Sequence, residues 1–141
     1  MKGKYLVGVT GLTLKSIWNY PGFAKHAVPC FMEAQQTVGN IKADTKKVGS
    51  VHHTFTVWES REAMMSFVLS DTHRAAMKDF DKIATGKTIS YWCDKIPTWD
   101  EALEVWRNDG KTYKQSKYTG ADNTTGTVGI IDSAATTTEL N

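Results

Sequence analysis

The chain has 141 residues and a mass of 15.7 kDa, which fits a single domain. Hydrophobic residues make up 40% and charged residues 23% of the sequence, which excludes a wholly disordered chain. The 17 Lys and Arg residues against 15 Asp and Glu residues give a net charge of +2, too small to indicate a nucleic-acid-binding surface. No apolar stretch approaches the roughly 20 residues that cross a bilayer, and the first residues predict a strand rather than a secretory signal. We therefore expect a cytoplasmic protein with no nucleic-acid or membrane partner.

The two cysteines, Cys30 and Cys93, lie far apart in the sequence and form no C-x-x-C pair. This spacing favours two free thiols in a reducing compartment, although a disulfide stays open because the distance in space is unknown. The four histidines, at positions 26, 52, 53 and 73, show no H-x-x-x-H spacing. We therefore expect no metal site of the structural zinc type.

The first half of the chain alternates between strand and helix patterns. Residues 4–14 are rich in Val, Leu and Thr and predict a strand, and apolar residues at intervals of three and four predict a helix over 23–38. Pro29 falls inside that pattern, so it kinks the helix or begins a second one. Gly39 is the expected end of the helix.

A strand pair follows, and then two further helical stretches. We expect strands at 40–44 and 50–58, joined by a turn that uses Thr45, Lys46, Lys47 and Gly49.

Ser60 is the expected N-cap of the next helix, Asp71 the cap of the one after it, and Gly86 its end. A last strand is predicted at 88–93.

The final helix begins with a capping box, Thr98-x-x-Glu101, and presents Trp99, Leu103 and Trp106 on one face. The order of elements is that of a ferredoxin-like β-α-β-β-α-β fold in the α+β class, with an antiparallel sheet and an extra C-terminal helix. We assign residues 1–110 to this domain. Residues 111–141, rich in Thr, Gly and Ser, form a weakly structured extension.

Alternation along the strands sorts their side chains onto two faces. One face carries mainly apolar residues: Val51, His53, Phe55, Val57, Ile89, Tyr91 and Cys93. The other is polar with Trp at its ends: His52, Thr54, Thr56, Trp58, Thr88, Ser90 and Trp92. We expect the apolar face to lie under the two main helices and a second copy of the chain to cover the polar face, since bare Trp rings are costly. This predicts a homodimer that encloses a semi-polar chamber.

His52 is the main candidate for a catalytic residue of that chamber, because an imidazole titrates near neutrality and can move protons or bind a haem iron. A hydrogen-bonded structural histidine is the alternative. His73 near a helix start is the second catalytic candidate, as a guard of the chamber mouth, whereas His53 is expected to be structural and His26 solvated. The expected substrate-binding residues are Thr10, Thr54, Thr56, Trp58, Ser90 and Trp92.

The segment Thr54–Met77, TFTVWESREAMMSFVLSDTHRAAM, resembles the strand-plus-helix core of the antibiotic-biosynthesis-monooxygenase-like superfamily, in its spheroidene-monooxygenase-like or small uncharacterised branches. The resemblance implies a dimeric α+β barrel that acts on, or binds, a small molecule. The haem-degrading branch carries a helix Trp and, ten residues later, an iron-binding His. Those positions fall on Phe67 and Met77 here, so that branch is disfavoured.

These features predict a small-molecule monooxygenase-like enzyme. It would be an oxidoreductase that acts on a flat, largely apolar substrate, either without a cofactor or with haem. Three alternatives stay open: a haem or small-ligand binding protein, a cofactor-free cyclase or isomerase, and a scaffold whose cavity is filled by side chains. The expected partners are a second copy and a small-molecule ligand.

Overall fold

A computed structural model describes residues 3–112, which form an α+β domain built on one antiparallel sheet. The five strands lie in the order β2-β3-β1-β4-β5. Their bounds are β1 (Tyr5–Leu14), β2 (Asn40–Val48), β3 (Val51–Trp58), β4 (Ala84–Cys93) and β5 (Lys111–Thr112). The helices are η1 (Ile17–Asn19), α1 (Tyr20–Gln36), α2 (Arg61–Val68), α3 (Asp71–Ile83) and α4 (Trp99–Asp109). The predicted ferredoxin-like order is confirmed, and the predicted extension beyond Thr112 lies outside the described residues.

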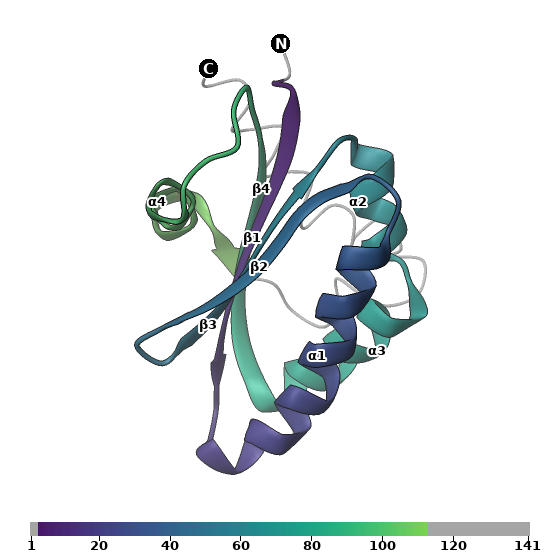
Figure 1. Cartoon of the computed structure of the whole chain (residues 1–141). Helices are drawn as coiled ribbons and strands as arrows, with labels where there is room; N and C mark the ends of the chain where they lie inside the picture. The colour runs from purple at the N-terminus through teal and green to yellow at the C-terminus, as the bar shows by residue number, and fades with distance from the viewer. Residues whose placement is uncertain (1–2, 113–141) are drawn as a thin grey trace.

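The sheet is covered on both faces. Figure 1 shows α1, α2 and α3 on one side of it and α4 on the other. The central strand β1 pairs with β3 along one edge and with β4 along the other. This register places Thr10 opposite both Thr54 and Thr88, so side chains from three strands line up in rows across the sheet.

Helix α1 is one continuous helix of 17 residues with Pro29 inside it, so no second helix begins at Pro29. The helix ends at Gln36, three residues before Gly39, its predicted end. Gly39 has φ +95°, and a Cβ there would lie 2.4 Å from the Cβ of Ala63, so both the backbone conformation and the space require glycine.

The turn between β2 and β3 is shorter than predicted. Strand β2 runs through Thr45, Lys46 and Lys47 to Val48, and only Gly49 and Ser50 separate it from β3. Gly49 supplies the positive φ of +61° that such a tight turn needs. The prediction was wrong because β2 is an edge strand, where polar residues are tolerated and resemble a turn in sequence.

The caps of the helices are set by local side chains. Ser60 accepts a hydrogen bond from the N–H of Ala63 and Thr98 completes the capping box with Glu101, both as predicted. The cap of α3 is Ser70, one residue before the predicted Asp71. Helix α3 ends at Ile83, and Gly86, its predicted end, lies within β4, which pairs with β1 along its whole length.

The predicted assignment of the two sheet faces was wrong. Trp58 packs with Met64 of α2 and Ala34 of α1, so the polar face lies under the main helices. The aliphatic face packs against Ala102 and Leu103 of α4. Alternation separates two faces but does not say which helix covers which. Helix α4 takes the aliphatic face, leaving α1–α3 on the polar one.

Candidate active site

A cavity of about 460 Å³ lies between the sheet and helices α1, α2 and α3. Such a volume is within the usual range for small-molecule sites. Its floor is formed by residues of β1, β3 and β4: Gly8, Thr10, Thr54, Thr56, Trp58 and Thr88. Its roof is apolar and includes Phe23, Ala34, Met64, Phe67, Met77 and Phe80. The polar face of the sheet is therefore covered by the chain's own helices, whereas the sequence predicts that a second copy covers it.

A row of threonines crosses the floor on four adjacent strands. Thr45 pairs with Thr54, Thr54 with Thr10, and Thr10 with Thr88. The Thr88 hydroxyl lies 3.3 Å from the carbonyl of Val9 and 3.0 Å from the hydroxyl of Thr10. Because Thr88 donates its one proton to the carbonyl, it accepts the proton of Thr10. The hydroxyls of Thr45 and Thr54 have no partner within the described residues and can bind a ligand.

The next row consists of Thr56, Gly8 and Ser90. Gly8 leaves the floor open, since a Cβ there would lie 2.9 Å from the Thr56 hydroxyl and 3.1 Å from Cε of Met64. Ser90 is only 1% exposed and Trp92 packs against the cluster around Trp58. Neither of these two predicted binding residues is part of the cavity lining, whereas Thr10, Thr54, Thr56 and Trp58 all are.

Trp58 closes one end of the floor. Its side chain is fully buried and its ring stacks on Phe67 of α2, with centroids 5.7 Å apart and an interplanar angle of 23°. Its indole N–H has no acceptor within the described part of the chain. A buried donor without a partner is costly, so this end of the cavity favours a ligand that brings an acceptor.

His73 lies at the same end of the cavity, with its ring 4.8 Å from that of Phe67. Its Nδ1 is 3.0 Å from the main-chain carbonyl of Val68. A carbonyl only accepts, so Nδ1 carries the proton and Nε2 keeps a free lone pair. Burial lowers the pKa of His73 to about 4, so the imidazole is neutral at physiological pH. The cause is the loss of water around the buried ring.

His52 lies at the opposite end. His52 pairs with Leu12 of β1, and Trp58 pairs with Leu6 of β1. His52 and Trp58 are therefore six residues, or about 20 Å, apart along the strand. The His52 ring packs 4.7 Å from that of Phe23, and its pKa is lowered by burial and by the charge of Lys47. The two catalytic candidates are therefore not brought together.

His53 points to the other face of the sheet, where its ring meets the edge of Trp106 at 4.5 Å. His53 therefore lies beneath α4 rather than under the main helices as predicted, and its structural role stays a prediction. Burial lowers the pKa of His53, and its Nδ1 has no partner within the described residues.

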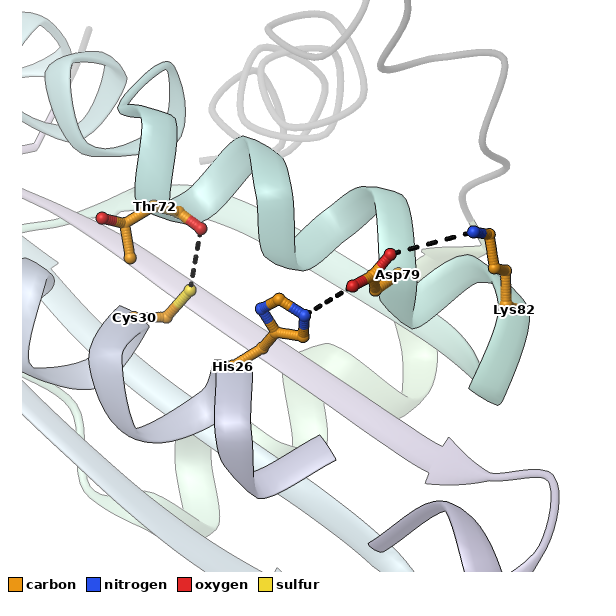
Figure 2. A network of polar contacts seen from close by, with 5 residues as sticks. All are labelled: His26, Cys30, Thr72, Asp79 and Lys82. Atoms are coloured by element: carbon orange, nitrogen blue, oxygen red, sulfur yellow. Dashed lines mark hydrogen bonds and ion pairs between the residues drawn. The ribbon is translucent and has the colours of Figure 1, made fainter. Parts of the chain in front are cut away.

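Polar contacts join helices α1 and α3 of the cavity roof along their line of contact, which we call the seam. His26 of α1 lies 2.6 Å from Asp79 of α3, which also faces Lys82 at 3.9 Å (Figure 2). One turn along, the Cys30 thiol donates to the main-chain carbonyl of Thr72 at 3.6 Å. The prediction of a solvated His26 was wrong, because its partner is on a helix 53 residues away and no local pattern indicates it.

The cysteines are both free, Cys30 on α1 and Cys93 at the end of β4. Burial raises the pKa of each thiol to about 11, which makes them poor nucleophiles. In residues 3–112, no three His, Cys, Asp or Glu side chains come close enough to hold a metal ion. Within the same range, each helix is too short or too polar to span a bilayer.

Residues 18–127 match the family described as a domain of unknown function, DUF3291. The chain belongs to the DUF3291 family. The match spans nearly all of the described fold from η1 onward, including the cavity roof and most of its floor. No curated protein matches this DUF3291 chain.

Solved structures share the fold of this DUF3291 domain. A candidate antibiotic biosynthesis monooxygenase from Nitrosomonas europaea has 10% identity and a TM-score of 0.59, with 66% of this chain and 93% of that one covered. SnoaB, a cofactor-independent oxygenase from Streptomyces nogalater, has 8% identity and a TM-score of 0.56, with coverage of 66% and 96%. A Bacteroides thetaiotaomicron protein of unknown function, a possible oxidoreductase, has 12% identity and a TM-score of 0.58, with coverage of 64% and 99%.

At these identities the likeness establishes the fold alone. It confirms the predicted likeness to antibiotic-biosynthesis-monooxygenase folds, while the spheroidene-monooxygenase branch stays a prediction.

Proposed function

We propose that this DUF3291 protein is a monooxygenase-like enzyme that oxidises a flat, largely apolar small molecule inside the cavity beneath α1–α3. The observation that carries the proposal is His73, a neutral imidazole whose Nδ1 is fixed on the Val68 carbonyl and whose ring lines an apolar cavity. The oxygenase and oxidoreductase descriptions of the structural neighbours support the same class of reaction.

In the proposed reaction the substrate supplies all the electrons. One CH₂ group and one O₂ give one C=O group and one water, so the atoms balance without a separate reductant. The Nε2 atom of His73 would accept a proton from the activated CH₂ or from a phenolic hydroxyl conjugated with it, and the substrate anion formed beside the ring would stabilise the imidazolium that burial disfavours. Trp58 and Phe67 would hold the flat ring, and the hydroxyls of Thr54 and Thr56 would bind its oxygens. The apolar roof would exclude water from the reactive anion.

The first test is oxygen uptake by the purified full chain with a panel of phenolic and polyene substrates. Replacing the base, in His73→Gln, is expected to lower turnover by about 10²–10⁴-fold. The control is His26→Gln, on the outer seam between α1 and α3, which is expected to keep turnover within about twofold. Unchanged turnover in His73→Gln would remove the base role and with it this proposal.

The same histidine favours a second candidate, a haem-binding protein. An imidazole whose Nδ1 donates to a carbonyl and whose Nε2 is free has the arrangement of a metal-ligating histidine. When bound, haem would supply redox chemistry at its iron. Titration with haem is expected to give a Soret band that His73→Gln abolishes, and a spectrum equal to that of free haem would reject this candidate.

A cofactor-free cyclase or isomerase would use the same pocket and base without oxygen. Turnover that persists under argon would separate this activity from the oxygenase.

We also propose that the protein is a cytoplasmic homodimer. The family resemblance supports the dimer, and so do Ile17 and Trp18, which are 80% and 84% exposed in the single chain. Large apolar side chains exposed together often mark an interface. The free thiols Cys30 and Cys93 support a reducing compartment. Light scattering of the full chain is expected to give twice the monomer mass, and the monomer mass would overturn the dimer.

A further inference from the structure

The charged residues that line the cavity are two lysines, Lys46 and Lys47, and within the described residues no Asp or Glu joins them. Their side chains lie on different faces of the sheet. The ammonium of Lys46 lies 5.7 Å from the ring of Trp99, on the face that α4 covers. Lys47 pairs with His52 and therefore shares the face of the cavity. Among residues 3–112, the cavity thus has one cationic side chain on its own face and no anionic one.

Lys47 stands at the mouth. Among the lining residues, the exposed ones are Val28 on α1 and Thr45, Lys46 and Lys47 on β2. The opening is therefore between α1 and the edge strand β2. The far end is closed, since Trp58 is fully buried.

Three further polar side chains surround Lys47 on the floor. Cross-strand pairing joins Lys47 to His52 and Thr45 to Thr54, and each pair is two residues along from the other. These four side chains form a patch about two strands wide and two rows long, with neighbouring Cβ atoms about 5–7 Å apart. The side chains of Lys47, Thr45 and Thr54 have no hydrogen-bond or ion-pair partner within the described residues. A neutral His52 offers one ring N–H, so four donors face one small region.

We propose that the cavity takes an elongated apolar carboxylic acid, whose carboxylate lies at the mouth against Lys47, His52, Thr45 and Thr54. The largely apolar body would extend under α1–α3 toward Trp58 and His73, where an uncharged oxygen at its far end would accept a hydrogen bond from the Trp58 indole N–H. This inference names the substrate class of the proposed function and rests on its cavity as the substrate site. The reverse orientation is disfavoured, because a carboxylate at the inner end would be buried among Phe67, Met64 and Val68 without a cation.

The test compares carboxylic acids with their own methyl esters, which keep the apolar body and lose the charge. Calorimetry on the full chain would measure the affinities of decanoate, 2-naphthoate and their two esters. The wild-type chain is expected to bind each acid about tenfold more tightly than its ester, the usual size of a charge-assisted hydrogen bond. Lys47→Gln is expected to remove most of that preference while leaving the ester affinity unchanged.

The matched control is Lys46→Gln, the adjacent residue on the other face, with the same change in net charge. It is expected to keep the preference for the acid. Equal or tighter binding of the esters by the wild-type chain would overturn the inference. An equal loss of the acid preference in the two lysine variants would also overturn it, and so would the absence of binding of either acid at millimolar concentration.

The oxygen-uptake assay separates this result from the proposed function. Acid-selective binding that depends on Lys47, without oxygen uptake, would support the ligand class and reject the oxygenase. Turnover of esters as fast as of acids would reject the ligand class and keep the oxygenase.

Discussion

The Nδ1 atom of His73 lies 3.0 Å from the main-chain carbonyl of Val68, five residues earlier in the chain. That contact spans the break between α2 and α3, because Val68 is the last residue of α2 and His73 is in the first turn of α3. The helix break thus fixes both the tautomer and the position of the ring. The contact with Val68 positions the ring, while burial keeps the imidazole neutral.

The first prediction concerns acid stability. Burial lowers the pKa of His73 to about 4, below the value of 6.5 for a free imidazole, so the unfolded chain binds this proton first as the pH falls. The His73 contribution to the free energy of unfolding should be constant above pH 6.5 and should decrease between pH 6.5 and 4. Urea unfolding across this range checks it. The His73→Gln variant, which keeps a donor for the Val68 carbonyl, should show a flatter profile. An identical slope in both proteins would contradict the assignment.

The second prediction concerns the seam of the roof. The hydrogen bond from His26 is the main cause that lowers the pKa of Asp79 below its usual 3.8. Because the folded-state pKa is depressed, the stabilisation is present above about pH 4 and is lost as the pH falls through the lowered value. Asp79→Asn should therefore reduce the pH dependence of unfolding below pH 4. A pH dependence below pH 4 equal to that of the wild type would contradict this view of the seam.

The third prediction concerns the depth of the cavity. A Cβ added at Gly8 would lie 2.9 Å from the Thr56 hydroxyl and 3.1 Å from Cε of Met64. The two methyl groups of a valine at this position would extend further into the cavity. Gly8→Val should lower the affinity for ligands at least tenfold. Gly22→Ala on α1 is the control, since its Cβ would meet only Cδ1 of Ile83 at 3.9 Å. Calorimetry with the acids used above measures both variants, and unchanged binding in Gly8→Val would show that the ligand lies elsewhere.

The fourth prediction concerns the docking of α4. A Cβ at Gly11 would lie 2.3 Å from Cζ2 of Trp106, whose indole N–H donates to the carbonyl of Lys87 at 2.7 Å. Gly11→Ala must therefore displace Trp106 and should cost about 1–3 kcal/mol of unfolding free energy. Thermal unfolding checks the loss, and a shift in Trp emission should accompany it. The Gly22→Ala variant should lose no stability, because alanine replaces glycine in a helix with open space around it. A Gly11→Ala chain as stable as the wild type would show that Trp106 does not pack as described.

Local chemistry in the sequence was sufficient for much of the fold. Ser60 and the Thr98–Glu101 box act on backbone groups within three residues, so their roles are visible without a structure. The alternation of Thr54 and Thr56 with Phe55 likewise gave the correct partition of side chains between faces. The family likeness was visible in one stretch of strand and helix.

The rest depended on contacts between distant parts of the chain. Which face α4 covers is decided by its packing against Val7, Phe55 and Tyr91, and no spacing in the sequence encodes that choice. The row of threonines needs the register of four strands at once. The state of His73 depends on a carbonyl, which has no signature in the sequence. For these reasons the sequence predicts a chamber between two copies of the chain, whereas the structure has a cavity within one chain.

Helix α4 also has a mechanical consequence for the cavity. Helix α4 packs on the face of the sheet opposite the cavity, with Ala102 and Leu103 in the same cluster as Val9 and Ile89. This packing prevents the threonine-bearing floor from moving away when a ligand binds. Helices α1 and α3 on the other side of the cavity are joined to each other by the polar contacts His26–Asp79 and Cys30–Thr72 and by the packed rings of Phe23 and Phe80. Both the floor and the roof are therefore held by packing of their own, so the size of the cavity limits the size of the ligand.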